Sequence, residues 1–311
     1  MTDYNIITID DSGYPERLRN IYDPPQALYV KGKLPDIDSL PVVGVVGTRQ
    51  CTHYGITTAE KVCKELSQSG IVVTTGMARG VDAAAAKGAL SGGGPVIGVV
   101  ASGIDIDYPA SNRPLYSELL DNGGAIISEY PPGTPPLKHH FPARNRIISG
   151  ISLGVAVIEA PKRSGALITA ARALEHGRDV FALPGNVDSL LCEGSNALLR
   201  EGAIPFMSAD DIIDEYVELY PDRISSPKNA GTKKPIDRTS KVDYIDLGNL
   251  LNKLEGDEKI VVNAIGTQAV PIDEIIITTG FPAQKVLAVL TMLELSGYIH
   301  GDNNGNWEIT T

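Results

Sequence analysis

The sequence predicts an α/β protein in which an open, doubly wound parallel sheet is followed by a small winged-helix domain. Short apolar runs alternate with helical segments from Pro41 to about Tyr220, and such runs are typical of parallel strands buried on both faces. Residues 223–242 are rich in turn formers and charges, which indicates a linker. Helix, turn, helix and hairpin then follow over residues 243–311, which is the plan of a winged helix.

The elements are predicted in this order. Residues 1–40 form a lead-in that packs on the core and ends in a strand near 27–30. The domain at 41–222 opens with a strand at 42–46 and a helix at 57–66, which Gly70 is expected to end. Further strands are predicted at 71–74, 96–100, 125–128, 154–158 and 180–183, with an alanine-rich helix at 82–90. The last domain has predicted helices at 258–265, 272–278 and 283–296, and strands at 297–300 and 306–309 around the turn Asn303-Asn304-Gly305.

Composition limits the possible functions. The chain has 311 residues and a formal net charge of -11, so it is not expected to coat duplex DNA with its whole surface. One concentrated basic patch would still be compatible with nucleic-acid binding. We find no apolar run of membrane-spanning length and no signal-peptide pattern at the start. Cys51, Cys63 and Cys192 are odd in number and form no C-x-x-C pair, so reduced thiols in the cytoplasm are expected, with no disulfide and no zinc site.

One short basic cluster contrasts with this acidic background. Between residues 138 and 146 the chain carries the cations Lys138, Arg144 and Arg146, the aromatic Phe141 and the amide Asn145, with no acid among them. Bases of a single-stranded nucleic acid stack on aromatic rings, and cations hold its phosphates. The alternative is a loop in which Phe141 caps the core and the arginines are merely solvated.

The carboxyl ends of the predicted strands carry a second signal, because open parallel sheets bind ligands there. The first strand is followed by Gly47-Thr48-Arg49, where backbone N–H groups and a guanidinium favour an anion. Gly76 follows the next strand, and Ser164-Gly165 precede a helix further on. Together with the basic cluster, these turns indicate a phosphate-binding crevice. The predicted nucleic-acid-binding residues are therefore Gly47, Thr48, Arg49, Gly76, Lys138, Phe141, Arg144, Asn145, Arg146, Ser164 and Gly165.

The common enzyme motifs are missing from the sequence. The first turn is G-x-x-G rather than G-x-G-x-x-G, and we find no G-K-[ST] and no G-x-S-x-G, so neither a dinucleotide nor another nucleotide cofactor is expected. The five histidines show no metal spacing, and His139-His140 is interpreted as a pair in a loop. Glu129 and Glu159 lie at strand ends, where we expect them to accept hydrogen bonds from loop N–H groups.

Motifs between residues 10 and 206 occur in the order of one known family. They include Tyr14-Pro15-Glu16-Arg17-Leu18, Val46-Gly47-Thr48-Arg49, Gly76-Met77-Ala78-Arg79-Gly80-Val81-Asp82, Ser128-Glu129-Tyr130-Pro131, Phe141-Pro142-Ala143-Arg144-Asn145-Arg146, Ser164-Gly165-Ala166-Leu167-Ile168-Thr169 and Leu183-Pro184-Gly185. On these motifs the chain resembles the DNA-processing protein A family, also called DprA or Smf. Many members of that family carry a C-terminal winged helix.

This resemblance implies an extended Rossmann-like fold without a nucleotide cofactor and a binding rather than an enzymatic function. It also implies single-stranded DNA binding, loading of the RecA recombinase during natural transformation, and a homodimer formed through the Rossmann-like domain. The residues that match Arg49, Lys138 and Phe141 lie in the family's DNA pocket. Ala86 departs from the family, which usually has histidine there, and this puts in doubt any polar network around that position.

Two other classes of function remain as alternatives. Nucleoside-monophosphate phosphoribohydrolases have a related sheet and a glycine-containing turn before a helix, and they need a carboxylate beside the ribose, for which Glu159 is the candidate. A scaffold that binds only protein would leave the basic cluster unexplained.

Overall fold

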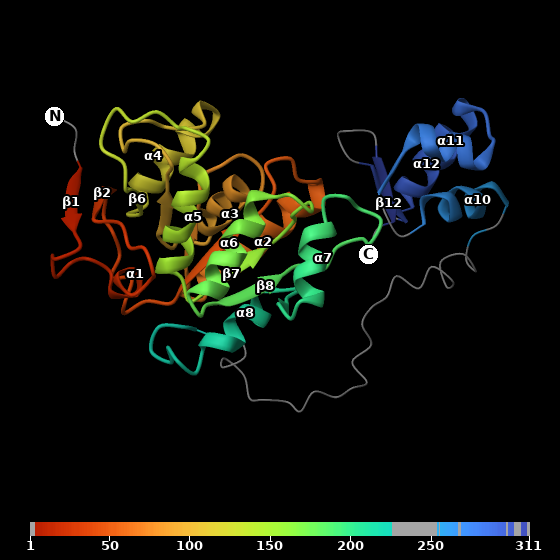
Figure 1. Ribbon diagram of the computed structural model, residues 1–311. Helices are drawn as coiled ribbons and strands as arrows, with labels where there is room; N and C mark the ends of the chain where they lie inside the picture. The colour runs from red at the N-terminus through yellow and green to blue at the C-terminus, as the bar shows by residue number, and fades with distance from the viewer. Residues whose placement is uncertain are drawn as a thin grey trace. The chain divides into compact units, whose positions relative to one another are not determined.

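The computed structural model describes residues 4–225, 254, 256–266, 269–296, 298–301 and 306–309 (Figure 1). The chain divides into two compact units, Met1–Lys233 and Lys234–Thr311. Most of the predicted linker and the predicted turn at 303–305 lie outside the described residues.

The first unit is built on a nine-stranded sheet in the order β1-β2-β6-β5-β4-β3-β7-β8-β9. The strands from β6 to β9 along this order are parallel, as predicted, and every residue of β3 to β7 is buried. Their bounds are β3 (Val42–Val46), β4 (Val72–Thr75), β5 (Val96–Val99), β6 (Ala125–Ser128), β7 (Gly154–Val157), β8 (Asp179–Ala182) and β9 (Ile204–Pro205).

The lead-in does more than pack on the core. It forms β1 (Asn5–Thr8) and β2 (Ala27–Gly32), and β2 pairs antiparallel with β6, so the lead-in extends the sheet at one edge. The short helix α1 (Glu16–Arg19) lies between these strands in the chain and buries Leu18.

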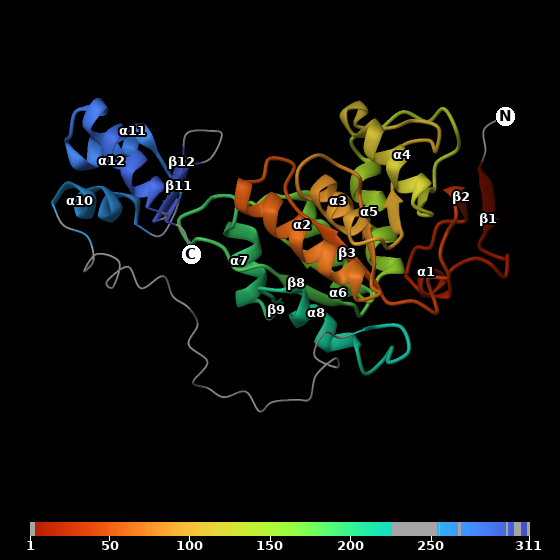
Figure 2. The same ribbon diagram turned by 180° about the vertical axis from the view of Figure 1, so that it is seen from behind.

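Helices cover both faces of the sheet, and consecutive strand residues point to opposite faces. Val43 and Val45 belong to the core under α2 (His53–Gln68) and α3 (Val81–Ser91), whereas Val42 and Val46 belong to the core under α5 (His140–Ile151) and α6 (Gly165–Glu175). Figure 1 views the α5 and α6 face, and Figure 2 shows α2 and α3 from behind. The remaining helices are the 3-10 turn η1 (Ala110–Asn112), α4 (Arg113–Asp121), α7 (Glu193–Arg200) and α8 (Ala209–Tyr216).

Most of residues 138–146 are helical. Helix α5 begins at His140 and its first turns carry Phe141, Arg144 and Arg146, so the alternative of a loop does not hold for these residues. His140 is itself buried at 7% exposure and stacks on Tyr130 with ring centroids 4.0 Å apart. The interpretation of His139-His140 as a loop pair is therefore wrong for His140.

The second unit has the winged-helix plan that the sequence predicted. Its helices are α10 (Gly256–Ile265), α11 (Ile272–Thr279) and α12 (Ala283–Leu295), and β10 (Val270–Pro271), β12 (Asn306–Ile309) and β11 (Ile299–Gly301) form a three-stranded sheet in that order. Gly280 ends α11 in the left-handed conformation at φ 67°, which glycine adopts without strain. A separate core includes Val262, Ile275 and Leu290.

Among the described residues, no single helix has the length and apolar character to cross a bilayer. Helices α11 and α12 meet that test only when they are taken together, and the pair is bent by 112°.

Candidate nucleic-acid interface

A cavity of about 920 Å³ opens at the carboxyl ends of the parallel strands. Its walls come from the segments that follow β3, β4, β5 and β7 and from the first turns of α5. The neighbouring strands β3 and β7 send their following helices, α2 and α6, to opposite faces of the sheet. This is the topological switch point, where open α/β sheets bind ligands.

The turn after β3 is fixed by backbone contacts on both sides. The Thr48 N–H donates to the carbonyl oxygen of Glu159 at 2.7 Å, and the Val81 N–H donates to the carbonyl oxygen of Thr48 at 3.2 Å. Gly80 has a φ of 72°, and a Cβ there would collide with the backbone of Thr48 and Arg49. The turn is thus held between the segments that follow β4 and β7, while Arg49 remains exposed.

Phe141 lies in the wall of the cavity and is only half-buried. The guanidinium carbon of Arg49 lies 4.8 Å from its ring centroid, and the Tyr108 ring lies 5.9 Å away. An aromatic ring in contact with a cation at a cavity wall suits the stacking of a base close to a phosphate.

Arg144 forms part of the floor of the cavity and is not a free cation. Its side chain is only 4% exposed, and it donates to the carbonyl oxygen of Gly76 at 2.8 Å and to that of Val99. It therefore joins the ends of β4 and β5. A Cβ on Gly76 would contact both the Arg144 guanidinium and the Asp82 carboxylate, at 2.5 Å and 2.7 Å, so these opposite charges lie on the same side of Gly76.

Burial and mutual attraction act in opposite directions on these two groups. Burial raises the pKa of the Asp82 carboxyl, and the Arg144 charge counteracts this rise. Burial likewise lowers the pKa of the Arg144 guanidinium, and Asp82 counteracts that change. The neighbouring Asn145 donates to the carbonyl oxygen of Gly165 at 3.2 Å and so connects α5 to the start of α6.

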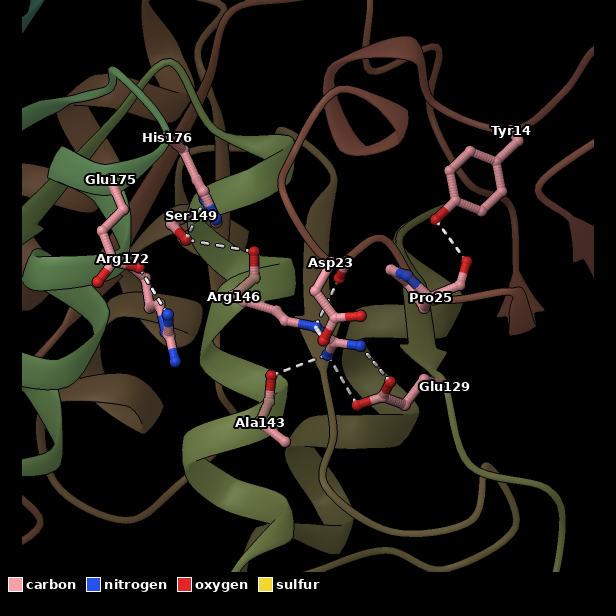
Figure 3. Close-up of polar contacts among 10 residues, drawn as sticks. All are labelled: Tyr14, Asp23, Pro25, Glu129, Ala143, Arg146, Ser149, Arg172, Glu175 and His176. Carbon is pink, nitrogen blue, oxygen red and sulfur yellow. Dashed lines mark hydrogen bonds and ion pairs between the residues drawn. The ribbon is translucent and has the colours of Figure 1, made fainter.

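Arg146 does not line the cavity, and it forms ion pairs with Glu129 and Asp23 (Figure 3). Its guanidinium donates to both carboxylate oxygens of Glu129, at 2.9 Å and 2.7 Å, and to the carbonyl oxygen of Asp23 at 2.8 Å. These bonds fasten the lead-in to the end of β6. The predicted loop N–H partners of Glu129 are wrong, because its partner is Arg146.

Glu159 has the role that the sequence predicted for it. It is 1% exposed, its carboxylate accepts hydrogen bonds from the Thr52 N–H at 2.8 Å and from the Thr52 hydroxyl, and it does not line the cavity. The carboxylate that a phosphoribohydrolase would need beside a ribose is therefore engaged elsewhere.

The structure gathers most of the predicted site residues. Nine of the eleven line the cavity, namely Gly47, Thr48, Arg49, Gly76, Phe141, Arg144, Asn145, Ser164 and Gly165. Lys138 and Arg146 do not line it, and Lys138 is exposed just before α5.

The cavity residues that sequence reasoning missed include Arg79, Arg163, Tyr108 and Asp82. Arg49 was predicted because it is a cation in the segment that follows a parallel strand. Arg79 and Arg163 also lie in such segments, so the same criterion could have identified them. Tyr108 and Asp82 depend on how distant segments pack. Within the described part of the chain, no group of three His, Cys, Asp or Glu side chains is arranged to hold a metal ion.

The fold and this cavity define a Rossmann-like protein with a cavity at the sheet switch point and, in its second unit, a winged helix. The family described as DNA recombination-mediator protein A matches residues 5–217, and the DprA winged helix domain matches residues 249–302. The chain belongs to the DNA-processing protein A family, DprA or Smf, as its motifs indicated.

Similar proteins cover much of this chain. DNA processing protein DprA of Streptococcus pneumoniae is 46% identical over 67% of the chain and 73% of its own length. Protein Smf of Escherichia coli is 36% identical over 95% of the chain and 75% of its own length.

Solved structures of DNA processing protein A share the fold. The Streptococcus pneumoniae structure matches with a TM-score of 0.65 at 44% identity, over 69% of this chain and 75% of that one. The Helicobacter pylori structure, described for its unique single-stranded DNA binding mode, matches with a TM-score of 0.63 at 29% identity, over 70% of this chain and 97% of that one.

Proposed function

We propose that this protein binds single-stranded DNA in the cavity, protects incoming DNA and loads the RecA recombinase onto it, acting by binding rather than by catalysis. The observation that carries this proposal is the exposed Arg49 against the half-buried Phe141 at the sheet switch point. The single-stranded DNA binding described for the Helicobacter pylori relative supports it. Incubation with adenosine monophosphate should accordingly release no adenine.

The proposed DNA contacts are those whose polar groups face the cavity. Arg49 would take a phosphate, and Phe141 would stack on a base. Gly47 and Thr48 would hold Arg49 in position, because the Thr48 N–H already donates to the Glu159 carbonyl oxygen and the Gly47 N–H to the Asp82 carboxylate. Gly76, Asn145, Ser164 and Gly165 would let the strand approach the backbone closely. Lys138 would bind a phosphate of the DNA outside the cavity. Arg144 and Arg146 would not contact the DNA but would hold the elements around the cavity in place.

The proposal includes a cytoplasmic location and a homodimer. We place the protein in the cytoplasm with the recombinase, in agreement with three cysteines that are free thiols. A homodimer through the Rossmann-like domain is expected from the family, and sedimentation would test it.

Replacing Arg49 tests the site directly. Arg49→Ala should weaken binding of every oligonucleotide sequence alike, because a phosphate contact carries no base information. A plot of the logarithm of the binding constant against the logarithm of the salt concentration should become less steep by about 0.7 when one phosphate contact is lost. Near 0.1 M salt this loss lowers the affinity about fivefold. Titration of labelled oligothymidine at several salt concentrations measures both. An unchanged affinity and slope would place the DNA site elsewhere.

The winged helix is expected to contribute little to this affinity. From Asp257 to Thr311 the sequence has seven acids and two bases, Lys259 and Lys285. Lys285 is paired with Asp257 at 2.8 Å and lies over the Phe281 ring. Deleting residues 243–311 should therefore change single-strand affinity by less than about tenfold, or 1.4 kcal/mol. A much larger loss would show that this domain binds DNA.

A further inference from the structure

Three arginines in the cavity wall have no acidic side chain among the described residues to balance their charge. Two acids line the cavity, Asp82 and Asp107. Asp82 lies beside the buried Arg144, and Asp107 is paired with Arg113 at 3.4 Å. Once these acids are matched with their cations, Arg49, Arg79 and Arg163 remain in the cavity wall. This concentration of positive charge stands in a chain whose formal net charge is -11.

These three arginines are also free to act. All three are exposed, and within the described residues none of them forms an ion pair or a side-chain hydrogen bond. The other arginines of this region are engaged: Arg144 by backbone carbonyls, Arg146 by Glu129 and Asp23, and Arg113 by Asp107. Arg49 contacts the Phe141 ring, and this contact leaves its N–H groups available to a phosphate.

Their order in the fold follows from the strand order. Arg79 comes after β4, Arg49 after β3 and Arg163 after β7, and these strands are adjacent in the order β4-β3-β7 across the sheet. Neighbouring strands lie about 4.8 Å apart, so the three segments emerge side by side over roughly 10 Å of the sheet edge. Arginine suits such a row, because its guanidinium donates a fork of hydrogen bonds to phosphate oxygens.

We propose that Arg79 and Arg163 bind two further backbone phosphates, one on each side of the phosphate at Arg49. A single strand then crosses the cavity mouth perpendicular to the β-strands, from the β4 side to the β7 side, with a base directed toward Phe141. This inference rests on the proposed function and adds to it the path of the DNA and the number of phosphates held.

The test compares Arg79→Gln, Arg163→Gln and the double substitution with Arg49→Gln in the full chain. Binding of labelled oligothymidine is titrated at several salt concentrations. Each single substitution should lower affinity about fivefold near 0.1 M salt and reduce the log–log slope by about 0.7, and the double should lower affinity about 25-fold and the slope by about 1.4. Arg200→Gln is the matched control, because Arg200 is also exposed but lies at the end of α7 and outside the cavity wall.

Oligonucleotide length gives a second readout. The double substitution should have little effect on a dinucleotide, which has one bridging phosphate, and its full effect on oligonucleotides long enough to reach all three arginines. If Arg79→Gln and Arg163→Gln behave like Arg200→Gln while Arg49→Gln weakens binding, Arg79 and Arg163 do not bind phosphates. The proposed single-stranded DNA binding would still stand. If the native protein does not bind oligothymidine, the proposed function itself fails.

Discussion

Arg144→Met is expected to destabilise the Rossmann-like unit by about 3–5 kcal/mol, because it removes the cation beside a buried carboxylate and leaves two buried carbonyl groups without their donor. Arg144 is 4% exposed, Asp82 is 6% exposed, and the carbonyls belong to Gly76 and Val99. Denaturant unfolding of the full chain, followed by circular dichroism, measures the change in the free energy of unfolding.

The pH dependence of this loss has a definite sign. Burial raises the pKa of Asp82 and Arg144 opposes that rise, so the pKa should increase further in Arg144→Met. A folded-state pKa above the unfolded value means that the folded protein holds the proton more tightly, so acid favours the folded state at this site. The difference in the free energy of unfolding between Arg144→Met and the native protein should therefore be largest above the pKa of Asp82 in the folded variant. It should shrink as pH falls toward about 4, the pKa of an unfolded aspartate.

Two controls separate this effect from a general loss of charge. Arg144→Met combined with Asp82→Asn removes both charges and should recover part of the stability. Arg172→Met removes an exposed arginine that pairs with Glu175 on the surface of α6, and it should change stability by less than about 1 kcal/mol. An Arg144→Met protein as stable as the native one at neutral pH would contradict the structural role and return Arg144 to the set of DNA contacts.

Phe141→Ala is expected to weaken single-strand binding by about 1–3 kcal/mol while leaving the fold intact, because the ring would stack on a base. The ring is half-buried at the cavity wall, whereas a fully buried phenylalanine would cost about 3–5 kcal/mol of stability on truncation. Thermal melting measured alongside oligothymidine binding distinguishes the two outcomes.

The contact between Arg49 and Phe141 sharpens this experiment. The guanidinium carbon lies 4.8 Å from the ring centroid in the absence of DNA, so a base that stacks on this side of the ring must displace Arg49. Phe141→Tyr keeps an aromatic surface and should retain most of the affinity, whereas Phe141→Leu keeps bulk without a π face and should behave like Phe141→Ala. A destabilised Phe141→Ala protein whose folded fraction binds normally would rule out stacking.

The sequence by itself determined the layout of the protein. Apolar runs such as Val42–Val46 can be buried on both faces only as parallel strands covered by helices, and the strand was found at those residues. The helix-turn-helix pattern before two short strands likewise determined the winged helix. Ligands bind at the carboxyl ends of parallel strands. Arg49 and Gly76 follow predicted strands and Ser164 precedes a predicted helix, and together with the basic cluster these positions predicted one crevice. All three residues line the cavity.

Only the tertiary structure decided what each cation in the basic cluster does. Arg144 and Arg146 are two residues apart in the chain and therefore point in different directions on α5, one under the cavity and one toward Glu129 and Asp23. Their partners come from strands and loops far away in the sequence, so no local pattern could separate a buried structural arginine from a free one. The tertiary structure also decided the strand order β4-β3-β7, which brings Arg79 and Arg163 to either side of Arg49.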